Sequence, residues 1–138
     1  WTERTGPTAA IACINKFQEK NVAENLIKCG KKVQQGWKTI SRKHDLAIKI
    51  DGIPPLSHFT FNENHNVLKA LFIQLMLEKG FLASNIYYAM YAHTDDHITN
   101  YLEAVDEVFT TLINLNKSGD VESSLKGKPA KAGFKRLT

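Results

Sequence analysis

The first residues of the chain combine a hydroxyl, a tight turn and a helix start. Thr2 lies five residues before Pro7, and Gly6 between them permits a tight backbone. Pro7 has the fixed φ angle that suits the first turn of a helix. A phosphate needs fixed hydrogen-bond donors, and a threonine beside a helix start offers them with little side-chain entropy to lose. The segment predicts an anion site with Thr2 as donor, although an ordinary helix start after a loop has the same pattern.

Glu3 and Arg4 are further candidates for the same pocket, with less weight than Thr2. The lysines of the first two predicted helices are expected on solvated faces, so we assign no catalytic residue to this chain.

A second cluster, His93-Thr94-Asp95-Asp96-His97, has two histidines four residues apart with two carboxylates between them. Imidazole and carboxylate are metal ligands. However, the glutamate of the HExxH motif is absent. His93 also precedes Thr94, the expected N-cap, and the helix dipole favours Asp95 and Asp96 in a first turn. We therefore interpret the cluster as a capped helix start and predict no metal site.

Hydrophobic periodicity predicts helices that alternate with strands. The expected helices are 7–20, 22–43, 65–79 and 94–116, and the expected strands are 46–50, 57–61 and 81–91. Asp51-Gly52 is expected to turn the chain, Pro54-Pro55 to stop the ladder, and Gly80 to occupy the C′ position of the third helix.

These elements predict an α+β fold, with a small antiparallel sheet of about three strands covered by helices. Trp37 belongs to the core stripe of the second helix. The predicted core face of the first helix comprises Ala10, Cys13, Ile14 and Phe17. The predicted core face of the sheet comprises Ile48, Ile50, Phe59, Phe61, Ile86, Tyr88 and Met90.

Composition is that of one folded domain. The chain has 138 residues, of which 43% are apolar and 23% charged. Its net charge of +4 is concentrated in residues 120–138, where five basic residues face two acidic ones. A nucleic-acid module would spread basic residues over its folded surface, so we predict no nucleic-acid partner.

Cys13 and Cys29 lie at helical positions without CxxC spacing and are expected to be buried, reduced thiols of a cytoplasmic protein. No apolar run is as long as a membrane span and no signal peptide is visible, so we predict no membrane partner.

Several segments, taken in order, resemble one enzyme family. Thr2-x-x-x-Gly6-Pro7 is similar to a segment of class III pyridoxal-phosphate (PLP) aminotransferases, with the glutamate-1-semialdehyde aminomutase branch and its sugar- and polysaccharide-biosynthesis relatives nearest. Residues 52–61, 78–82 and 92–98 resemble strands and a helix start of the C-terminal small domain of these fold-type-I enzymes, and 133–137 resembles the closing segment of the sugar branch.

The resemblance implies that Thr2 binds the phosphate of PLP held by the neighbouring subunit of a homodimer. The Schiff-base lysine and the acidic partner of the pyridine nitrogen lie in the large domain of this family, upstream of the Thr2 segment. This chain would then be inactive alone, whereas its parent would be an aminotransferase or aminomutase acting on an amino acid or an amino- or keto-sugar.

The same resemblance divides the chain into a helical connection from the large domain (1–45), a small α+β domain (46–116) and a basic C-terminal tail (117–138). The chain begins with Trp1 rather than Met, so we expect an N-terminally incomplete polypeptide.

Two alternatives remain open. The chain could be a stand-alone α+β interaction module whose basic tail binds an acidic partner or nucleic acid. It could also be a small metal-dependent hydrolase that uses His93 and His97.

Overall fold

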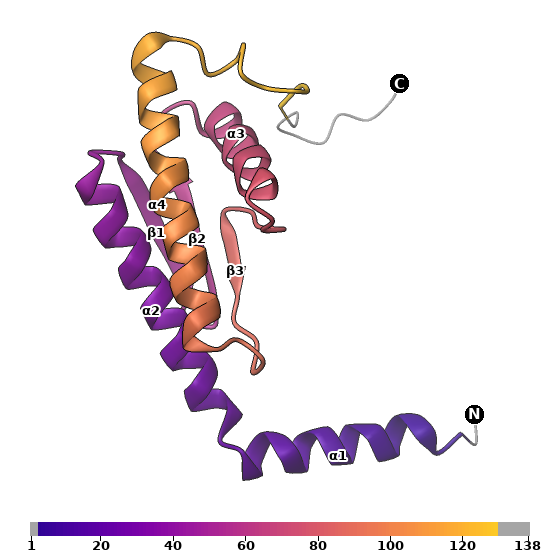
Figure 1. Cartoon of the computed structure of the whole chain (residues 1–138). Helices are drawn as coiled ribbons and strands as arrows, with labels where there is room; N and C mark the ends of the chain where they lie inside the picture. The colour runs from indigo at the N-terminus through magenta and orange to yellow at the C-terminus, as the bar shows by residue number, and fades with distance from the viewer. Residues whose placement is uncertain (1–2, 130–138) are drawn as a thin grey trace.

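A computed structural model describes residues 3–129 of the chain. Its elements are α1 (Thr5–Glu19), α2 (Val22–Lys43), β1 (Ile48–Ile53), β2 (Leu56–Phe61), α3 (His65–Glu78), β3 (Ile86–Tyr88) and α4 (Asp95–Ser118) (Figure 1). The predicted α+β class is confirmed, and the bounds of α2 are those expected from its periodicity.

The sheet is antiparallel, with strand order β1-β2-β3. Strands β1 and β2 form a hairpin in which Ile48 pairs with Phe61 and Ile53 pairs with Leu56. The two residues between the strands, 54 and 55, make the turn. Strand β3 joins the other edge of β2, where Tyr87 pairs with Ser57.

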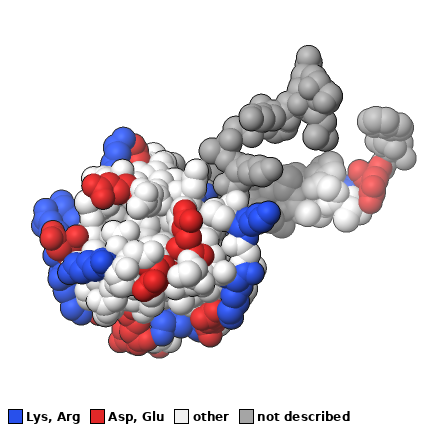
Figure 2. Space-filling view, turned by 90° about the horizontal axis from the view of Figure 1, so that it is seen from above, with Lys and Arg blue, Asp and Glu red and all other residues white. Residues whose placement is uncertain are grey.

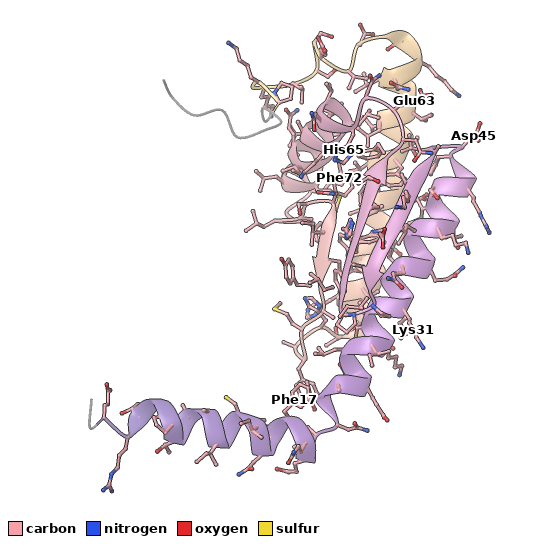
Figure 3. The ribbon with its side chains drawn as sticks, turned by 180° about the vertical axis from the view of Figure 1, so that it is seen from behind. Phe17, Lys31, Asp45, Glu63, His65 and Phe72 are labelled. Atoms are coloured by element: carbon pink, nitrogen blue, oxygen red, sulfur yellow. The ribbon has the colours of Figure 1, made fainter. Side chains whose placement is uncertain are left out.

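All three long helices of the domain pack on one face of this sheet. The ring of Phe59 on β2 meets Trp37 of α2 at 5.0 Å, Phe72 of α3 at 5.3 Å and Phe109 of α4 at 5.9 Å between centroids. Seen from behind, the strands lie in front of the helices, and no other element of the described part of the chain covers their second face (Figure 3). Residues 3–129 therefore form a two-layer domain with one open sheet face, plus the projecting helix α1.

Two helices approach their neighbours closely at glycines. A Cβ on Gly30 of α2 would lie 1.7 Å from the backbone oxygen of Pro54 in the hairpin turn. A Cβ on Gly36 would meet only the end of the Leu102 side chain of α4, at 2.5 Å. The two glycines that weaken α2 as a helix therefore let the hairpin and α4 approach it.

The predicted helix ends are confirmed for α3 and α4. Thr94 caps α4 in a capping box: its hydroxyl accepts a hydrogen bond from the His97 backbone N–H at 3.2 Å, and Nδ1 of His97 accepts one from the Thr94 backbone N–H at 3.2 Å. Gly80 follows the C-cap of α3 with φ +85°, which is the conformation expected at C′.

The turn prediction at Asp51-Gly52 is wrong. Gly52 does have positive φ (+90°), and its N–H donates to the Asp51 carboxylate at 2.8 Å, but both residues belong to β1. The ladder continues to Ile53 before Pro54 and Pro55 reverse the chain. The Asp51-Gly52 pair therefore places a positive-φ glycine within β1, and the hairpin loop lies two residues later.

The third strand is shorter than predicted, and its core face is reversed. Only Ile86–Tyr88 pair, and Ile86, Tyr88 and Met90 are exposed. Tyr87 faces the core instead, with its ring 6.5 Å from that of Trp37. Period two leaves the choice of face open when apolar residues occupy both sets of alternate positions.

The core face predicted for the first helix is also wrong. α1 begins at Thr5, two residues earlier than expected, and has no buried residue. Ile14 is 57% and Phe17 46% exposed, and Cys13 is exposed as well. The helix runs away from the sheet, as Figure 1 shows, so none of the other elements within residues 3–129 lies over its apolar side. Of the two cysteines, only Cys29 is buried.

Candidate functional site

The main sequence candidate, Thr2, lies outside the described residues. Glu3 and Arg4 beside it are exposed. Gly6 and Pro7 lie within the first turn of α1, so the chain is already helical where the tight turn was expected. The N-terminal end of α1 is far from the sheet (Figure 1). An anion bound there would need its other ligands from outside the α+β body.

The His-Thr-Asp-Asp-His cluster forms a hydrogen-bonded site with β3. The hydroxyl of Tyr87 lies 2.8 Å from Nδ1 of His93, and the two rings stack with centroids 5.4 Å apart. The Met90 backbone N–H also points at this Nδ1, at 3.2 Å. Since a backbone N–H can only donate, Nδ1 is the acceptor, Tyr87 donates to it, and the neutral imidazole carries its proton on Nε2.

His97 is held in the same tautomer. Its Nδ1 accepts the Thr94 backbone N–H, so its Nε2 also carries the proton when the ring is neutral. Burial, and then the neighbouring His97, lower the pKa of His93 below its ordinary value. Burial, and then Cys29, raise the pKa of Tyr87 to about 12. The pair is thus a neutral phenol donating to a neutral imidazole.

These two histidines line a cavity of about 460 Å³ between the segment after α3, strand β3 and the first turns of α4. Most of its wall is aromatic or aliphatic, including Phe81, Tyr87 and Tyr101. No lysine, arginine or carboxylate belongs to its lining. The arrangement suits a small apolar ligand that accepts hydrogen bonds.

A wider groove of about 850 Å³ lies between α2 and β1. Its cationic residues, Lys31, Lys38 and Arg42, are spread along α2. Lys31 points outward from the helix in Figure 3. The groove is somewhat more open than the cavity beside β3.

Surface charge on the domain is largely balanced. Lys32 pairs with Asp95 at 2.5 Å, Lys43 with Asp106 at 2.5 Å and Lys79 with Glu107. Figure 2 shows Lys and Arg interspersed with Asp and Glu on the face seen from above. Such a surface gives little support to a nucleic-acid interface on the described part of the chain.

Within residues 3–129 no group of three or more His, Cys, Asp or Glu side chains is placed to hold a metal ion. Over the same residues, every helix is too short or too polar to cross a bilayer.

No protein-family model matches this chain. Among solved structures, its fold is similar to the PLP internal aldimine form of the FumI protein of Sphingopyxis sp. MTA144, with a TM-score of 0.62 and 24% sequence identity. The match covers 69% of this chain and 24% of that chain. The likeness establishes that the α+β fold of this domain recurs as about a quarter of a larger protein.

Sequence reasoning missed the Tyr87–His93 pair. Tyr87 lay in the expected strand 81–91 with no assigned partner, and His93 was weighed as a metal ligand and then interpreted as part of a capped helix start. The position of His93 just before a helix cap was a usable signal for a hydrogen-bonded histidine, because a ring there can accept a backbone N–H. Its partner could not be predicted, because the sequence pattern did not determine which face of β3 carries Tyr87.

Proposed function

We propose that this chain is the C-terminal small domain of a PLP-dependent aminotransferase or aminomutase of class III, from the sugar- and polysaccharide-biosynthesis branch. Its fold likeness to part of a PLP protein and the segments around Thr2, Gly80 and Thr94 support this proposal together. The parent would be a cytoplasmic homodimer whose substrate is an amino acid or an amino- or keto-sugar.

The observation that carries the proposal is the bare apolar side of α1. Ile11, Ile14 and Phe17 are 60%, 57% and 46% exposed and recur at helical spacing on a helix that projects from the domain. Contiguous exposed apolar surface of this kind marks an interface. A large domain in the parent would cover it, with α1 in the connection assigned to residues 1–45, whereas α2 of that range packs on the sheet. Residues 46–116 would then form the small domain and 117–138 the basic tail.

PLP would serve the parent as an electron sink at the carbon that bears the amino group. The described residues could contribute only secondary contacts to the binding of PLP. The lining of the cavity beside β3 contains no lysine to carry the cofactor and no cation for its phosphate. We assign the lysine and the partner of the pyridine nitrogen to the large domain, and to Thr2 a hydroxyl and backbone N–H that bind the phosphate held mainly by the other subunit.

One experiment tests whether the Schiff-base lysine lies outside this chain. The 138-residue chain, incubated with PLP and desalted, should retain no cofactor absorbance and should not transaminate. A retained band that disappears on substitution of a single lysine of this chain would contradict the proposal.

A second experiment tests Thr2 in the full-length parent. Thr2→Val keeps the shape and deletes the donor, so it should weaken PLP binding by about ten- to a hundredfold, since a hydrogen bond to a charged group contributes about 1.5–3 kcal/mol. Thr8→Val, on the exposed surface of α1, is the matched control and should leave affinity nearly unchanged. Equal affinity of both variants and the parent would reduce Thr2 to a helix-start residue.

A further inference from the structure

The cavity beside β3 has the features of a binding site that the proposed function does not use. It is a half-open cavity formed by three separate segments of the chain, and its volume of about 460 Å³ lies in the usual range for small-ligand sites. It contains neither the Thr2 segment nor a lysine, so the inference does not rest on the assignment of PLP.

Its apolar walls are set at defined angles. The Tyr87 ring stacks on Tyr101, with centroids 6.2 Å apart and planes 28° apart. Phe81 meets Tyr101 edge-on at 6.1 Å. Tyr101 is in turn held by the Trp37 indole N–H, which donates to its hydroxyl at 3.0 Å. These contacts fix the rings in place, and a preformed aromatic wall favours a flat, unsaturated ligand over a flexible one.

The two histidines of the cavity present hydrogen-bond donors. Because backbone N–H groups occupy Nδ1 of both His93 and His97, each neutral ring has only its Nε2–H left to donate. The lining has no carboxylate, and Asp95, at the start of α4, is neutralised by Lys32 at 2.5 Å. Two N–H donors without a competing anion select a ligand that accepts hydrogen bonds, and an ionised acceptor forms the stronger bond.

We propose that this cavity binds a small planar aromatic carboxylate. The ring system lies against the wall formed by Phe81, Tyr87 and Tyr101, and the carboxylate accepts hydrogen bonds from His93 and His97.

The probe is 2-naphthoate, titrated into the 138-residue chain and followed by calorimetry and by the histidine ring resonances in NMR spectra. We expect saturable one-to-one binding with shifts of the His93 and His97 rings. 2-Naphthylmethanol, which keeps the rings and loses the charge, should bind at least about tenfold more weakly. Absence of saturable binding below about 1 mM naphthoate, or equal affinity for the two compounds, would overturn the proposal.

His97→Glu tests the hydrogen-bond donor without disturbing the fold. Glutamate at this position preserves the capping box with Thr94, so α4 should remain stable. It removes the N–H and adds a negative charge, so naphthoate affinity should fall at least about tenfold while naphthylmethanol affinity changes less than about twofold. Unchanged naphthoate binding would contradict the role of His97.

Asn100→Trp tests the place of binding. Asn100 is exposed on α4 and lines this cavity, so an indole there should obstruct it and reduce affinity for both compounds at least about tenfold. Thr99→Trp is the matched control, because Thr99 is also exposed on the same turn but lines a different surface depression. If Thr99→Trp weakens binding as much as Asn100→Trp, the ligand does not occupy this cavity.

Discussion

The hydroxyl of Tyr101 is a polar group in the middle of an aromatic core. It accepts the indole N–H of Trp37, which is 0% exposed. Burial raises the pKa of this phenol, so it stays neutral at physiological pH. A buried donor that loses its partner costs about 1–3 kcal/mol.

We therefore expect Tyr101→Phe to lower the free energy of unfolding by about 1–3 kcal/mol, because it leaves the Trp37 N–H without an acceptor. Urea denaturation measures the effect. Tyr88→Phe removes the same atom from a side chain that is 64% exposed and should change stability by less than about 0.5 kcal/mol. Equal effects of the two substitutions would show that the Trp37–Tyr101 bond adds nothing.

Two histidines give the fold a dependence on pH. Burial lowers the pKa of His93, assisted by His97, and also lowers the pKa of His65, assisted by Lys69. Since the folded-state pKa values lie below the unfolded value of 6.5, the unfolded chain binds more protons as the pH falls through this value. Stability should be complete above about pH 7 and decrease as the pH falls through 6.5 toward the folded pKa values.

Urea midpoints at a series of pH values between about 8 and 5 will measure this dependence, and the double variant His65→Gln/His93→Gln should have a flatter profile. If stability falls with pH equally steeply in the variant and in the original chain, other titratable groups cause the pH dependence.

At the scale of elements, the hairpin turn and α2 are fitted to one another through Gly30. A side chain at this position would collide with the backbone of Pro54, which cannot rotate away. We expect Gly30→Ala to destabilise the domain by about 1–3 kcal/mol or more, despite the better helix propensity of alanine. Thermal or urea unfolding measures the change.

Gly36→Ala is the internal control for that substitution. Its Cβ would meet only the flexible end of Leu102, and alanine favours the helix by about 1 kcal/mol, so the net effect should be small. If Gly36→Ala destabilises the domain more than Gly30→Ala, the close approach of the turn is not what requires glycine.

The helices were the predictable elements. The stripe through Val33, Trp37 and Ile40 has the period of a helix, and all three residues are buried as expected. The strands were harder, because Ile86 and Tyr88 were as plausible inward as Tyr87. Asp51-Gly52 has the strongest hairpin signal of the chain but does not form the loop.

The candidate site was less predictable than the fold. His93, Thr94 and His97 were singled out, and the cap was foreseen from local preferences. Their cavity depends on Tyr87 and Phe81, which reach it only through tertiary packing. Helix caps and hydrophobic periodicity can be predicted from local sequence. The cavity forms only where three separate segments of the chain come together, and that depends on the whole fold.

For the whole molecule, the uncovered apolar side of α1 predicts self-association of the chain by itself, with a dimer as the expected species. Ile14→Glu/Phe17→Glu should shift the equilibrium toward monomer, because it places charges on that side. Sedimentation velocity over a range of concentrations measures the shift.

Ala9→Glu/Ala12→Glu adds the same charges to the opposite side of the exposed helix and should leave association nearly unchanged. A chain that remains monomeric at high concentration without any substitution would contradict this expectation.

The bond between Trp37 and Tyr101 joins residues that are 64 positions apart in the chain, whereas β1 and β2 are joined by a two-residue turn. Because closing a long loop costs more conformational entropy than closing a short one, we expect the hairpin and its contact with α2 to form first during folding, and α4 to dock last. Until α4 docks, the rings of Phe59 and Trp37 remain exposed to solvent. In a variant with Trp1 replaced by phenylalanine, the fluorescence of Trp37 will therefore follow the final closure of the domain in real time.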